Sequence, residues 1–131
     1  MNIYIMQKSI TDIKKPVLKK EYETFAITVE DFISEMVIRN FKRKKESIDY
    51  IAIFDELISL NSERFAYEKK YITNFSLDDM IEFALTAFKD KIYLIKNVTK
   101  NIQYDNLTDD MNLSQNDEIV LIKLKYMRGA I

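Results

Sequence analysis

The chain has 131 residues, and its 20 basic and 21 acidic side chains leave a formal net charge of −1, so no overall field attracts nucleic acid or an anionic membrane. It contains no histidine, no cysteine and one glycine, Gly129. These absences exclude histidine-dependent and cysteine-dependent catalytic triads, zinc–thiolate sites and HExxH helices, and the single glycine excludes a P-loop and a GxGxxG turn.

The composition is that of a folded globular protein, with 47% hydrophobic and 31% charged residues. The length fits one domain over residues 1–131. No run reaches the ~20 apolar residues that a membrane span needs, and the first residues lack the charged region of a secretory leader. We therefore expect a single cytoplasmic domain.

Two short β-prone runs, residues 3–10 and 17–25, begin the chain. A polar link that ends in Pro16 separates them, and proline cannot donate to a central ladder. In the second run Tyr22 alternates with charged residues, which is typical of a half-buried strand. These features predict an N-terminal hairpin.

A helical period replaces this alternation at Thr28. Apolar residues recur at i, i+3, i+4 and i+7 along one face: Val29, Phe32, Ile33, Met36, Val37 and Phe41. Thr28 is the predicted N-cap with Asp31 at N3, and Ile27 and Phe32 are placed to form a hydrophobic staple. Four cations follow the helix, where the macrodipole favours positive charge.

The middle of the chain is less regular. Residues 47–58 predict another helix with a broad apolar stripe, whereas residues 61–74 have no clean period. Ser76 then begins the clearest helix, with Asp79 at N3 and Phe75 and Met80 as a second staple. Its stripe has no interruption: Leu77, Met80, Ile81, Ala84, Leu85 and Phe88.

The last third of the sequence predicts strands at residues 92–96, 98–104 and 119–127, with a turn at Asn97. In the final run Val120 and Ile122 share one face, while Ile119 and Leu121 share the other. A strand buried on both sides at its start has this pattern. Glycine does not mark the turns, so asparagine and aspartate are expected to supply their left-handed residues.

This order of elements predicts an α+β fold, a mixed sheet packed by helices with an insertion at about residues 39–75. Two strands leading into a capped helix, with a final strand near the chain end, are also the order of the β-grasp (ubiquitin-like) fold. That match is an analogy of topology.

Four segments carry a resemblance to a known family: PVLKKEYE at 16–23, ITVEDFISEMV at 27–37, ALTAFKDKIY at 84–93 and NDEIVLIKL at 116–124, followed by Met127-Arg128-Gly129. With them the chain resembles a family of small, functionally uncharacterised bacterial proteins with a β-grasp type layout. The resemblance leaves residues 39–75 poorly matched and implies an architecture without a known activity.

The chain end, Arg128-Gly129-Ala130-Ile131, also looks like that of the sulfur-carrier proteins of molybdopterin and thiamine synthesis. Those proteins end in a free Gly-Gly whose carboxylate is adenylated. Here the carrier interpretation requires removal of the last two residues and still leaves one glycine.

Three groups of side chains are candidates for sites. The basic cluster could neutralise phosphates or simply be a solvated helix end, and its members are Arg39, Lys42, Arg43, Lys44 and Lys45. The carboxylates at residues 30–35, 78–82 and 105–117 are of the type that binds Mg²⁺ or Ca²⁺, but they also suit helix caps and turns. Tyr67 and Tyr71 lie in the irregular segment and could form a contact surface.

The missing reactive side chains favour a non-catalytic protein-interaction module or adaptor, without cofactor or metal, that binds through the sheet face, a strand edge or the insertion. The alternatives are a nucleic-acid accessory protein using residues 42–45, a carboxylate enzyme with a divalent ion, and an inhibitor encoded by a phage or mobile element.

Overall fold

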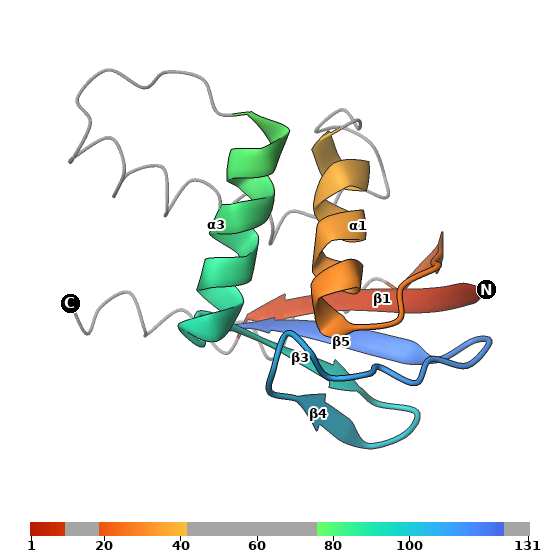
Figure 1. Cartoon of the computed structure of the whole chain (residues 1–131). Helices are drawn as coiled ribbons and strands as arrows, with labels where there is room; N and C mark the ends of the chain where they lie inside the picture. Colours follow the sequence, from red (N-terminus) through yellow and green to blue (C-terminus); the bar gives the residue numbers. More distant parts are fainter. Residues whose placement is uncertain (10–18, 42–75, 125–131) are drawn as a thin grey trace.

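The structure is a computed structural model that describes residues 1–9, 19–41 and 76–124 (Figure 1). These ranges form an α+β structure in which two helices, α1 (Val29–Phe41) and α3 (Leu77–Lys89), lie on one face of a mixed five-stranded sheet. The strands are β1 (Asn2–Ser9), β2 (Lys20–Glu23), β3 (Tyr93–Asn97), β4 (Ile102–Tyr104) and β5 (Glu118–Lys123). The predicted α+β class is confirmed, whereas residues 47–58, 61–74 and most of the expected insertion lie outside the described residues.

The sheet has the strand order β2-β1-β5-β3-β4. The pair β1 and β5 is parallel and central, and the other three pairs are antiparallel. Ile5 lies opposite Ile119, and Ile95 lies opposite Leu121, so apolar residues of β1, β5 and β3 share the face toward the helices. As expected for a central strand, β5 is buried on both sides at its start, at Ile119 and Val120.

The core lies between this row and the two helices. Each helix contributes residues of its predicted stripe, and α3 also buries Phe83 and Ala87, which the prediction did not include. Fully burying one large apolar side chain contributes about 1.5–3 kcal/mol. The stripe of α1 is buried from Val29 to Val37. Phe41 is an exception at 52% exposed, because it is the last residue of α1 and lies one turn beyond the last core residue of the stripe.

Both helices begin at the predicted caps. The Asp31 backbone N–H donates to Thr28 Oγ1 at 3.2 Å, and the Thr28 N–H donates to Asp31 Oδ2 at 3.1 Å. Ser76 and Asp79 form the same reciprocal box. The first predicted staple is not formed as expected, because Ile27 is 64% exposed while Phe32 is fully buried. Phe75 of the second staple lies outside the described residues.

Asparagine marks the turns, as the lack of glycine predicted. Asn101, Asn112 and Asn116 all have positive φ, and Lys91 is the fourth such residue in the described part of the chain. The predicted turn at Asn97 is wrong, because Asn97 is the buried last residue of β3 and the turn occupies residues 98–101. For the same reason β4 begins at Ile102 and not at Val98.

Replacing Thr28 by alanine is expected to lower the free energy of unfolding by about 1 kcal/mol, because the N–H of Asp31 loses its acceptor at the start of α1. Urea unfolding followed by circular dichroism measures the change. The matched control is Thr108→Ala, which alters an exposed threonine in the loop before β5. Equal losses in the two variants would show that the cap contributes nothing specific.

Candidate functional site

Arg39 is the one predicted partner-binding residue that the structure describes, since Lys42, Arg43, Lys44, Lys45, Tyr67 and Tyr71 lie outside the described residues. Its guanidinium Nη2 donates to the backbone oxygen of Glu23 at 2.5 Å, and its Cζ lies 5.4 Å from the ring centre of Tyr22. Arg39 therefore links α1 to β2.

This contact lies at an edge of the sheet. Edge strands leave backbone groups unpaired, and these groups can recruit another strand. The outermost strand β2 ends at Glu23, and Arg39 occupies its carbonyl. The contact thus makes strand addition at this end of β2 less favourable. The nucleic-acid hypothesis now depends on the lysine-rich residues 42–45. Because these lie outside the described residues, the hypothesis stays a prediction.

Several acidic residues of the predicted clusters accept hydrogen bonds from backbone N–H groups. Asp31 caps α1, and the N–H of Thr28, more than that of Ile27, lowers the pKa of its carboxyl despite partial desolvation. Asp109 accepts from the N–H groups of Asn106 and Asp105, which likewise lower its pKa. Within the described ranges, no group of three or more acidic side chains is arranged to hold a metal ion.

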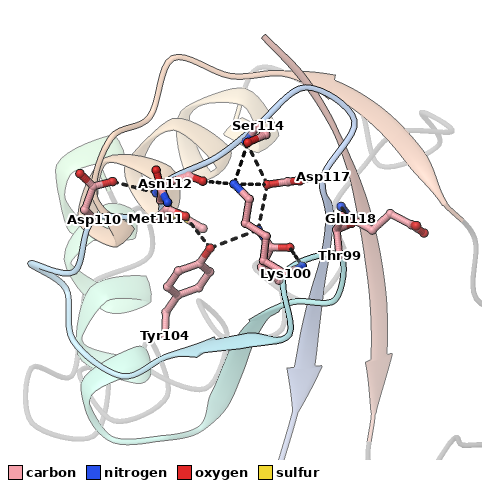
Figure 2. Close-up of polar contacts among 10 residues, drawn as sticks. Thr99, Lys100, Tyr104, Asp110, Met111, Asn112, Ser114, Asp117 and Glu118 are labelled. Atoms are coloured by element: carbon pink, nitrogen blue, oxygen red, sulfur yellow. Dashed lines mark hydrogen bonds and ion pairs between the residues drawn. The ribbon is translucent and has the colours of Figure 1, made fainter.

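Asp117 forms the centre of a buried polar network (Figure 2). Its Oδ2 accepts from Asn97 Nδ2 at 3.0 Å and from the Ser114 N–H at 2.9 Å, and it lies 3.1 Å from Lys100 Nζ. The ammonium group of Lys100 also donates to the carbonyl of Asn112 and to Ser114 Oγ. Burial is the largest single influence and would raise the pKa of Asp117, but the donors together outweigh it and lower the pKa.

Tyr104 extends the network to the next part of the loop. Its hydroxyl donates to the carbonyl of Met111 at 2.7 Å and accepts from Asn97 Nδ2 at 3.3 Å. Burial raises the pKa of this hydroxyl, so it stays protonated at neutral pH. Together with Lys100 and Asp117, Tyr104 fastens residues 105–117 to the β3–β4 hairpin.

The fastened loop positions the first turn of α1. The N–H groups of Val29 and Glu30 donate to the carbonyls of Asp109 and Leu107, each at 3.0 Å. Helix N-termini commonly bind anions through such free N–H groups. Here carbonyls of the loop accept from these N–H groups, so the network stabilises the loop and the helix start and does not form a ligand site.

Both described helices lie on one face of the sheet (Figure 1). The opposite face carries apolar side chains that lie outside the core cluster of the described residues. We call this surface the open face, and its apolar members are Tyr4, Met6, Leu94, Val120 and Ile122. Met6 lies opposite Val120, and Leu94 lies opposite Ile122. Val120 is 5% exposed, the others are half-buried, and none belongs to the core cluster of the described residues.

Charged side chains surround the open face. Lys8 lies opposite Ile122, and Lys96 lies opposite Val120. At the other end, Lys19 Nζ lies 3.2 Å from Glu118 Oε1 and 5.2 Å from the ring centre of Tyr4. The open face is thus an apolar strip with a polar rim.

Sequence reasoning named the sheet face only as one of three options. Apolar residues on both sides of β1 and β5 indicated a second apolar face. These residues become neighbours only when the two strands pair, and the sequence does not specify that pairing.

Comparison with protein-family models, with curated proteins and with solved structures finds no match to this chain. In the described ranges, neither helix has the length and apolar character that crossing a membrane requires.

Asp117→Asn is expected to lower the free energy of unfolding at pH 7 by about 2 kcal/mol, because Asn97, Ser114 and Lys100 lose a charged acceptor. Chemical denaturation measures the effect. The control is Asp110→Asn in the same loop, whose amide oxygen can still accept from the Asn112 N–H and which should stay within about 0.5 kcal/mol of the wild type. A lower free energy of unfolding in Asp110→Asn but not in Asp117→Asn would contradict the role given to Asp117.

The pKa of Asp117 also predicts how stability depends on pH. An unfolded aspartate has a pKa of about 3.9, and the folded value is lower. The stabilisation is therefore complete above pH 3.9 and is lost as the pH falls through the folded pKa. We expect the free energy of unfolding to decrease as the pH falls below about 3.9, and Asp117→Asn to reduce that decrease. Urea titrations at several pH values would contradict this if both proteins showed the same slope.

Proposed function

We propose that this chain is a small β-grasp module that binds another protein through its open face and has no catalytic site of its own. The arrangement of the elements supports a β-grasp layout. The hairpin β1–β2 leads directly into the capped helix α1, and β5 pairs beside β1 at the centre of the sheet. The order anticipated by analogy with the β-grasp fold is compatible with this pairing.

The apolar strip on the open face is the observation that carries the proposed function. Contiguous apolar patches with a polar rim mark interaction sites on soluble proteins. Both helices pack on the other face, so they leave Met6, Leu94 and Ile122 only half-buried. A protein partner that covers the strip would remove this apolar surface from water, which favours association.

The chemistry of the chain supports binding rather than turnover. A sequence without imidazole or thiol groups lacks the usual near-neutral proton carrier and the usual soft nucleophile. In the described ranges every buried side-chain nitrogen and oxygen has a hydrogen-bond partner. The polar groups of the Asp117 network are thus used to hold backbone in place.

The proposal predicts that Leu94→Glu and Ile122→Glu each weaken binding of the natural partner by about 30-fold in Kd, the ~2 kcal/mol typical of an interface hot spot. The reason is that each variant places a carboxylate within the apolar strip. The immobilised protein is incubated with an extract of cells that express its gene, and captured polypeptides are quantified by mass spectrometry. A captured protein is then purified and its Kd is measured by calorimetry.

Val98→Glu is the matched control, because it introduces the same charge at an exposed apolar residue in the β3–β4 turn. Circular dichroism establishes that each variant remains folded. Binding that Val98→Glu weakens as strongly as the two open-face variants, or that none of them weakens, would contradict the proposed role of the open face.

A further inference from the structure

A second exposed apolar site lies on the loop that joins β2 to α1, residues 24–28. Phe25 is 78% exposed and Ile27 is 64% exposed, the two highest values among the large apolar side chains of the described residues. Thr24 between β2 and Phe25 is buried, and Ala26 is half-buried against the core. Alternate residues therefore point outward, so Phe25 and Ile27 form an apolar pair on the surface.

The backbone that carries this pair is held in one conformation. The N–H of Phe25 donates to Glu35 Oε2 at 3.0 Å, and the N–H of Ile27 donates to Asp31 Oδ2 at 3.3 Å. Between them the N–H of Ala26 donates to Thr24 Oγ1 at 3.1 Å. Thr24 Oγ1 in turn donates to Glu35 Oε1 at 2.5 Å, so α1 fixes the loop from one side.

The loop before β5 fixes it from the other side. The carbonyl of Ile27 accepts from the Met111 N–H at 2.9 Å, and Thr28 forms a β-bridge with Asp110. Binding through a segment that is already ordered avoids the entropy cost of ordering it. The exposed pair is therefore suited to serve as a preorganised anchor.

The surroundings of the pair are acidic. Asp31 and Glu35 bind the backbone of the pair itself, and Asp109 and Asp110 lie on the adjoining loop. Glu23 and Glu30, both exposed, lie at the two ends of the segment. Arg39 offsets part of this charge where it contacts Glu23. The lowered pKa of Asp31 and of Asp109 keeps these carboxyls ionised at neutral pH.

We propose that Phe25 and Ile27, with the carboxylates around them, form a docking site for a basic protein segment that carries apolar anchor residues. The apolar pair supplies contact area, and the acidic surroundings select lysine or arginine beside the anchors. The same negative charge repels nucleic acid and anionic membranes. This site is separate from the open face, so it goes beyond the proposed function and gives the chain a second partner.

The probe is a fluorescein-labelled synthetic peptide in which leucines alternate with lysine pairs, and its binding at low salt is followed by fluorescence anisotropy. We expect saturable binding that Phe25→Ser combined with Ile27→Ser weakens at least tenfold. Glu30→Gln combined with Asp110→Asn should weaken it several-fold and make it less sensitive to salt, because two of the carboxylates are removed. A peptide in which serine replaces leucine should bind at least tenfold more weakly.

Two controls make the result specific. Phe41→Ser removes an equally large exposed ring at the other end of α1 and should leave the Kd unchanged. Leu94→Glu disables the open face and should also leave the Kd unchanged, so failure of the proposed function and failure of this site are distinguishable. The proposal is overturned if the serine peptide binds equally well, if Phe25→Ser with Ile27→Ser has no effect, or if light scattering shows a dimer of this chain that the same two changes dissociate.

Discussion

The carboxylate of Asp117 connects three segments of the structure that are separate in the sequence. It accepts from Asn97 at the end of β3, from Ser114 in the loop before β5, and from Lys100 in the β3–β4 turn. Residues 105–117 contain no strand of their own beyond the bridge at Asp110. These polar contacts fix their course together with Met111, which is buried in the core. A buried carboxylate is stable in such a place only because the charge is paired and hydrogen-bonded.

The consequences of this fastening reach α1. Carbonyls of the loop accept hydrogen bonds from the first N–H groups of the helix, and the Asp31 carboxylate accepts from the two N–H groups that precede them. The start of α1 is therefore enclosed by protein on both sides, and the chain just before it has no freedom to fold inward. Phe25 and Ile27 are left exposed on a rigid segment, which is the physical basis for treating them as an anchor rather than as incidental surface residues.

The two proposed surfaces differ in charge. The open face has Lys8 and Lys96 beside its apolar strip, whereas the Phe25–Ile27 site is surrounded by carboxylates. Partners of opposite charge character therefore suit the two sites. A small module with two such surfaces can bring two proteins together without any chemistry of its own, which is the role of an adaptor.

The sequence by itself determined the features that depend on neighbours three or four residues away. The caps at Thr28 and Ser76, the buried stripe of α1 up to Val37 and the asparagine turns could all be read from local spacing, because a cap or a turn is formed by side chains and backbone within one turn of chain.

The tertiary structure alone decided which strands pair and which surfaces remain open. Tyr4 lies opposite Glu118 across the central pair, and no local pattern specifies a contact so distant in sequence. Asn97 has the composition of a turn residue but ends a strand, because Asp117 and Tyr104 satisfy its amide there. Ile27 suits a staple but is exposed, because the loop before β5 binds its backbone. In each case a contact between distant segments outweighed the local preference, since burial and hydrogen bonding across the fold contribute more than propensity.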